Sequence, residues 1–194
     1  MVRKVARMRK PFLRLRHAAW LVLGLLAVAG LRPAIAAEAR TPAQCLRLVE
    51  VRLPDGEVLT ANFHDPGPFK GEDGKPVAAP TIPFCRVTAR LSPSPDSVVE
   101  VEVWLPVATW NGRLWGVGNG NFAGAISQRA LASRMGEGYA AVATDTGHEG
   151  KFFDASWAVG HPERVVDFGH RGIHVAAVMM VQVTLVARLP WLDR

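Results

Sequence analysis

The sequence predicts an α/β fold in which antiparallel strands lead into a strand–loop–helix–strand unit. Three observations support this class: alternating apolar residues over 85–91 and 99–105, a glycine-rich loop over 116–124, and an unbroken apolar run over 139–144. Alternation is typical of a strand with one buried face, and a short unbroken run is typical of a strand covered on both faces. Strands that precede such a unit favour one sheet with helices packed on it.

Residues 1–36 carry a targeting segment that does not belong to the fold. Seven basic residues precede an apolar run of 14 residues, Ala18–Leu31, and Ala34-Ile35-Ala36 gives a small-x-small cleavage pattern. The run is shorter than the roughly 20 residues that span a bilayer as a helix. This pattern predicts a cleaved secretory signal peptide, and an uncleaved membrane anchor is the alternative.

Removing this segment changes the charge of the protein. Eight of the 23 Lys and Arg residues and none of the 17 Asp and Glu residues lie within 1–36, so residues 37–194 carry a net charge of −2. Without a basic patch, we expect no nucleic-acid partner, and no membrane contact after cleavage. A secreted or periplasmic location favours a disulfide between the two cysteines, Cys45 and Cys85, over two buried thiols.

The elements after the signal follow from local patterns. Gly, Pro and charged residues over 65–76 predict a loop, and the apolar run over 58–63 an edge strand. The strand over 99–105 alternates strictly, which favours a half-buried position near a sheet edge. Further on we expect a strand over 113–117, a helix over 125–135, a strand over 139–144 and a helix from Phe168 that ends at Pro190.

The glycine-rich loop allows three interpretations. Glycines after a buried strand let backbone N–H groups converge on an anion, because no Cβ blocks the approach. That anion is either the oxyanion of an ester under cleavage or a phosphate, since Gly118-x-Gly120-x-x-Ala123 fits a dinucleotide-binding template with Asp145 as the ribose-binding acid. Asp145 follows Gly118 by 27 residues, later than the usual spacing of about 20. The third interpretation is close packing alone.

Three blocks resemble the tannase/feruloyl esterase family: Trp110–Ile126, Gly138–His148 and His161–His174. The resemblance implies an α/β-hydrolase fold with an inserted lid domain, which can carry calcium. It also implies a secreted serine esterase that acts on small-molecule esters of aromatic acids, such as gallates and ferulates. In this interpretation Gly118, Gly120 and Asn121 bracket the oxyanion donor. Asp145 and His148 are expected either to support that loop from behind or to form a turn held by Asp side-chain hydrogen bonds.

The nucleophile of that family lies in a Cys-Ser-x-Gly-Gly elbow, and the sequence contains neither this segment nor G-x-S-x-G. We therefore expect residues 37–194 to form a truncated N-terminal part of the hydrolase domain: first strands, oxyanion loop and flanking helices, without elbow and lid. Such a fragment would lack the triad and be inactive alone. A secreted, non-enzymatic binding module is the alternative.

The remaining polar residues predict no cofactor or metal site in this chain. His170 and His174 have the spacing of zinc ligands, but Arg171 stands where that motif needs Glu. Asp167 and Arg171 are spaced for an ion pair on an exposed helix face, which would contribute about 0.3–0.5 kcal/mol.

Overall fold

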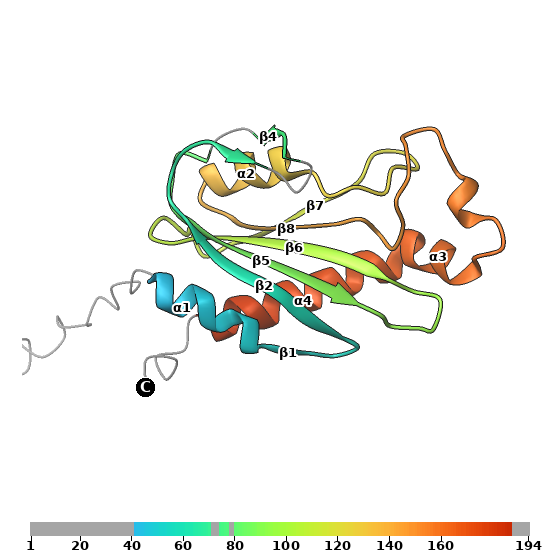
Figure 1. Ribbon diagram of the computed structural model, residues 1–194, viewed down its shortest axis with the longest axis horizontal. Coiled ribbons are helices and arrows are strands. Elements are labelled where there is room, and N and C mark those ends of the chain that lie inside the picture. Colours follow the sequence, from blue (N-terminus) through green and yellow to red (C-terminus); the bar gives the residue numbers. More distant parts are fainter. Residues whose placement is uncertain (1–40, 71–73, 78–79, 188–194) are drawn as a thin grey trace, which may run out of the picture. The chain divides into compact units, whose positions relative to one another are not determined.

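A mixed six-stranded sheet forms the centre of the fold, in the order β1-β2-β5-β6-β8-β7 (Figure 1). The computed structural model describes residues 41–70, 74–77 and 80–187, so the predicted signal peptide and the expected helix end at Pro190 lie outside the described residues. Neighbouring strands are antiparallel except β7 and β8, which are parallel. The strands are β1 (Arg52–Leu53), β2 (Gly56–His64), β5 (Phe84–Leu91), β6 (Val99–Pro106), β7 (Leu114–Val117) and β8 (Ala140–Thr144).

Helices cover both faces of this sheet. Figure 1 shows α4 (Gly172–Val186) on one face and α2 (Gln128–Gly136) on the other. The remaining elements are short: α1 (Pro42–Leu46), α3 (Pro162–Val166), and the strands β3 (Phe69–Lys70) and β4 (Pro76–Val77), which pair with each other within the predicted loop over 65–76. Among the described residues, no helix combines the length and the apolar character that crossing a bilayer requires.

The strand and turn predictions for 85–105 are confirmed, but the predicted place of the second strand is wrong. β6 lies between β5 and β8 and is covered on both faces. Its valines at 99, 101 and 103 pack toward α4, and Trp104 packs toward α2. Glu102 gives the strand its alternating pattern, yet its side chain is only 2% exposed. Hydrogen bonds from Arg86, Trp104 and Gln128 to its carboxylate compensate for this burial.

Each face of the sheet has its own apolar core. On the α4 side the strands pack against Ala176, Met179, Met180 and Val183. On the α2 side Leu131 and Met135 pack against Phe84, Trp104 and the alternate alanines of β8. The prediction that β8 is buried on both faces is confirmed, since all five of its residues are buried.

The predicted long helix from Phe168 begins earlier and is interrupted. It comprises α3, a π-helical turn at Asp167–Arg171, and α4. The prediction of an exposed Asp167–Arg171 pair is wrong, because Asp167 is fully buried at 0% exposure. Its carboxylate accepts hydrogen bonds from Ser97 Oγ at 2.6 Å and from Arg171 Nε. Arg171 also pairs with Glu163 at 2.7 Å, so this network ties the π turn to the turn between β5 and β6.

The structure joins Cys45 and Cys85 in a disulfide that ties α1 to β5. Both residues are buried, and 40 positions separate them in the sequence. Replacing both cysteines by alanine is therefore expected to lower the free energy of unfolding by about 2–4 kcal/mol, because the unfolded chain regains loop freedom. Urea unfolding measures this loss, and reduction of the wild-type protein should reproduce it. A double variant as stable as the oxidised wild type would contradict the prediction.

Candidate functional site

The glycine-rich loop leaves β7 at Val117 and does not run directly into a helix. Ten residues separate β7 from α2, whose N-cap is Ser127. A dinucleotide-binding loop places its glycines at the helix N-terminus, where the phosphates bind. The dinucleotide interpretation of Gly118-x-Gly120-x-x-Ala123 is therefore wrong, and Asp145, its expected ribose-binding acid, is turned inward and 7% exposed.

A second chain segment, residues 148–152, clamps the far half of the loop. Gly124 and Gly150 form an isolated antiparallel bridge with N–H···O distances of 3.2 and 3.4 Å. Phe122 N and Asn121 Nδ2 both donate to the carbonyl of Phe152, at 3.2 and 2.6 Å. Gly124 has to be glycine here, because a Cβ at this position would lie 1.9 Å from the backbone oxygen of His148.

The near half of the loop keeps its amides free. Within the described part of the chain, the backbone N–H groups of Gly118, Gly120 and Asn121 donate to no other residue. In a parallel ladder, every second residue of a strand bonds to the same neighbouring strand. Arg113 accepts a hydrogen bond from Ala140 N at 3.1 Å, so the odd-numbered residues that follow it bond to β8. The N–H groups of Gly116 and Gly118 therefore point away from β8, toward the open edge of the sheet. Asn121 adopts a left-handed conformation with φ 51°.

The turn that follows β8 packs behind this loop. Asp145 Oδ1 accepts hydrogen bonds from Gly147 N at 2.8 Å and from Glu100 N at 3.0 Å, so the turn expected from the sequence is present. Burial raises the pKa of Asp145 to about 7; these two hydrogen bonds lower it and only partly offset the burial. Asn119 Nδ2 donates to the carbonyl of Thr144 at 3.0 Å and links the start of the loop to the same turn.

His148 lies at the end of that turn and contacts the loop directly. Its Nε2 lies 3.0 Å from the carbonyl oxygen of Phe122, and the side chain is buried. The imidazole stacks on Trp157 with a centroid separation of 3.8 Å and meets Phe168 edge-on at 5.6 Å. The structure thus brings His148 and the loop together, whereas Asp145 contacts the backbone of its own turn and of β6.

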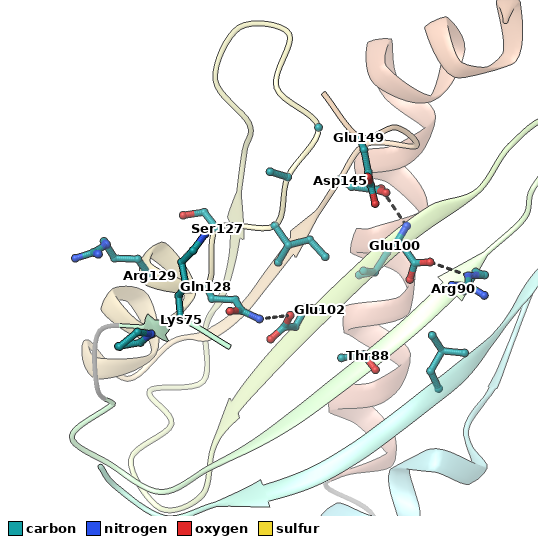
Figure 2. A pocket seen from close by; sticks show the side chains of 16 residues that line it. Lys75, Thr88, Arg90, Glu100, Glu102, Ser127, Gln128, Arg129, Asp145 and Glu149 are labelled. Carbon is teal, nitrogen blue, oxygen red and sulfur yellow. Dashed lines mark hydrogen bonds and ion pairs between the residues drawn. The ribbon is translucent and has the colours of Figure 1, made fainter. Parts of the chain in front are cut away.

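Two cavities border the loop. The larger one, about 870 Å³, lies where the end of the loop meets α2 and the open face of the sheet (Figure 2). Two side-chain contacts cross its lining: Arg90 pairs with Glu100 at 2.7 Å, and the Gln128 amide donates to Glu102 at 3.2 Å (Figure 2). The smaller cavity, about 210 Å³, is mostly apolar and lies beside Gly118; it is lined by Gly116, Val117 and Gly118 together with residues of β8 and α4.

The described residues offer no donor set for a metal. No group of three or more His, Cys, Asp or Glu side chains gathers there as a cation site, which also leaves His170 and His174 without further zinc ligands in that part of the chain.

Sequence reasoning missed the clamp and the buried network. The pairing of Gly124 with Gly150 joins residues 26 positions apart, and no local pattern reports it. The one available signal was the presence of isolated glycines on both sides of the predicted strand. The stacking of Trp157 on His148 likewise has no local pattern in the sequence that would predict it.

The chain matches known esterases in sequence. A family model described as tannase and feruloyl esterase matches residues 85–189. An uncharacterised esterase of Xanthomonas campestris pv. campestris is 37% identical over 141 residues, which cover 72% of this chain and 24% of the relative. A probable feruloyl esterase B-1 of Aspergillus flavus is 30% identical over 141 residues, which cover 70% of this chain and 26% of the relative.

Solved structures give the same picture. The crystal structure of feruloyl esterase B from Aspergillus oryzae superposes with a TM-score of 0.69 at 26% identity, over 77% of this chain and 30% of that one. The tannin acyl hydrolase from Aspergillus niger, with a TM-score of 0.54 at 19% identity, supports the fold alone. The predicted α/β-hydrolase class, with part of its sheet, is confirmed. The chain spans about a quarter of the length of the curated relatives it matches.

Proposed function

The chain belongs to the tannase and feruloyl esterase family, and on this premise we propose that residues 37–194 supply the oxyanion-binding part of a secreted serine carboxylic ester hydrolase. The substrate class would be small esters of aromatic acids, such as ferulates or gallates. The family model described as tannase and feruloyl esterase, and a relative named as a probable feruloyl esterase, support this class. No cofactor is needed for such acyl transfer, in which a serine attacks the ester carbonyl and forms an acyl-enzyme.

One observation carries the proposal: the amides of Gly118, Gly120 and Asn121 are free while the loop around them is held in place. In acyl transfer the carbonyl oxygen becomes an oxyanion, and fixed N–H donors stabilise it without reorganising. Each such donor typically lowers the barrier by about 3 kcal/mol. The near half of the loop offers these donors at the carboxyl end of β7, where the active sites of α/β folds gather.

The nucleophile would come from polypeptide that this sequence does not contain, because no elbow segment occurs within it. Two observations support this proposal. Among the described residues, no strand pairs with the outer edge of β7. The β7 side chains Leu114 and Trp115 are 41% and 39% exposed. Exposed apolar side chains also lie on α4, at Ile173, Val181 and Leu185. We propose that the rest of the hydrolase sheet adds at this edge and covers the apolar cavity.

The test compares the chain alone with a chimera in which a relative supplies the rest of an esterase. Residues 45–187 should replace the matching segment of the Xanthomonas relative, and the chimera and the 194-residue chain should both be assayed with methyl ferulate and methyl gallate. We expect the chimera to hydrolyse at least one ester and the chain alone to hydrolyse neither. Turnover by the chain alone above background would contradict the proposed fragment role. A folded chimera without activity would favour the binding module.

A matched pair of variants in the chimera tests the donor itself. Gly118→Pro removes the N–H, whereas Gly118→Ala keeps it, and a Cβ at this position meets no atom within 4 Å. If Gly118 is the donor, the proline variant should lose roughly 10²–10³-fold in kcat and the alanine variant should stay close to the parent. Equal losses in both variants would show that Gly118 does not act through its N–H.

A further inference from the structure

We infer that His148 is a positioning residue that holds the glycine loop in its donor-bearing shape through one hydrogen bond from a neutral imidazole. The catalytic consequence rests on the proposed function, but the contact itself does not. His148 Nε2 and Phe122 O are 3.0 Å apart, and they join the turn after β8 to the middle of the loop.

The chemistry of the contact fixes the tautomer. A carbonyl oxygen only accepts hydrogen bonds, so Nε2 must carry the proton. Nδ1 is buried and has no partner among the described residues, which suits an unprotonated ring nitrogen better than a second N–H donor. The geometry therefore assigns the neutral Nε2–H form to His148.

The imidazole is held too firmly to be a passive surface group. His148 is 4% exposed, stacked on Trp157 and bordered by Phe168. Its own backbone oxygen lies against Gly124, where even a methyl group would not fit. The residue thus contacts the loop twice, through its side chain at Phe122 and through its main chain at Gly124.

This double contact sets the plane of the peptide group that carries the Phe122 carbonyl. Phe122 directly follows Asn121, whose left-handed φ of 51° is unfavourable unless the surrounding contacts enforce it. Without the His148 bond, the Phe122 carbonyl loses its partner and the loop can relax toward ordinary backbone angles. The free amides of Gly118, Gly120 and Asn121 would then no longer be held in place, and fixed donors are what an oxyanion site requires.

The experiment uses two variants of the full chain that separate the donor from the ring. His148→Phe keeps an aromatic ring against Trp157 but has no N–H, whereas His148→Gln loses the ring and keeps an amide N–H near the Nε2 position. Amide hydrogen exchange of Phe122 and Gly124 is followed by NMR, with Val103 and Val142 of the central strands as internal references. We expect exchange at the two loop amides to be about five- to tenfold faster in the Phe variant and near wild type in the Gln variant. The reference amides should be unchanged.

The ¹⁵N spectrum of the wild-type imidazole gives a second, independent reading. A neutral Nε2–H tautomer supports the inference, and an Nδ1–H tautomer or a doubly protonated ring at pH 7 overturns it, even if the Phe variant does not fold. Unchanged loop exchange in a folded Phe variant, or no rescue by Gln, also overturns it. In the chimera, His148→Phe should lower kcat about tenfold with KM unchanged. Loop exchange as expected without any ester hydrolysis would contradict the proposed function and leave the positioning role intact.

Discussion

Replacing Asp167 by alanine is expected to lower the free energy of unfolding by about 3–5 kcal/mol. The carboxylate is fully buried and is bonded to Ser97 and to Arg171. Its removal leaves the half-buried Arg171 guanidinium paired only with Glu163, whose side chain is 39% exposed, and the buried Ser97 hydroxyl without an acceptor. Removing one partner of a buried charge pair is costly because the remaining groups lose their compensation in a low-dielectric site.

An exposed pair on the same protein provides the control. Arg134 and Glu137 form an ion pair at 2.9 Å with side chains 36% and 48% exposed. Glu137→Ala should therefore change stability by less than about 1 kcal/mol. Urea unfolding of both variants, with slopes compared, measures the difference. If Asp167→Ala stays within 1 kcal/mol of wild type, the network does not stabilise the fold as described.

The same network matters to the loop, because Asp167 supports the turn that carries His148. A Cβ added to Gly147 would lie 2.6 Å from the Cβ of Asp167, so the buried acid packs directly against that glycine. The π-helical turn at 167–171 brings Asp167 and Arg171 into this position. Insertions of this kind interrupt the regular helical ladder and often lie near functional sites.

Local patterns were sufficient for the strands but not for their order. β5, β6 and β8 were predicted within one residue of their observed bounds, because period-2 alternation and unbroken apolar runs have direct structural causes. The central position of β6 was missed because Glu102 resembles a solvent-facing residue. Only its partners Arg86, Trp104 and Gln128, from three different elements, make its burial tolerable.

The sequence predicts the position of the glycine-rich loop but not the contacts that hold it in place. The glycines at 118 and 120 and the Asp145 turn follow from residue type and spacing. The clamp at Gly124 and Gly150 and the contact from His148 to Phe122 depend on how two distant segments approach. Such non-local contacts leave no periodic signal in the sequence, so the sequence could suggest that amides converge there but not what holds them.

The second large effect concerns pH and the carboxyl group of Asp145. Its pKa in the folded protein is about 7, above the ordinary value of 3.8, chiefly because the group is buried. The folded state therefore binds the proton more tightly than the unfolded state does. The stability that this proton contributes is fully present below pH 3.8 and is lost as the pH rises toward and through 7.

Asp145→Asn should remove this dependence. An asparagine oxygen can still accept the hydrogen bonds from Gly147 and Glu100, but it never ionises. At pH 8 the variant is expected to be more stable than wild type by up to about 4 kcal/mol, with the difference shrinking toward zero near pH 4. Urea unfolding at pH 5, 6.5 and 8 measures both slopes.

Asp154→Asn serves as the matched control, because Asp154 is exposed and its pKa is lowered by the Ser156 backbone N–H. That variant should keep the wild-type slope between pH 5 and 8, since Asp154 stays ionised throughout this range. An Asp145→Asn protein with the same slope as wild type would mean that another group dominates the pH dependence. A variant that is less stable at pH 8 would mean that the turn behind the glycine loop needs the charge, and not only the two hydrogen bonds.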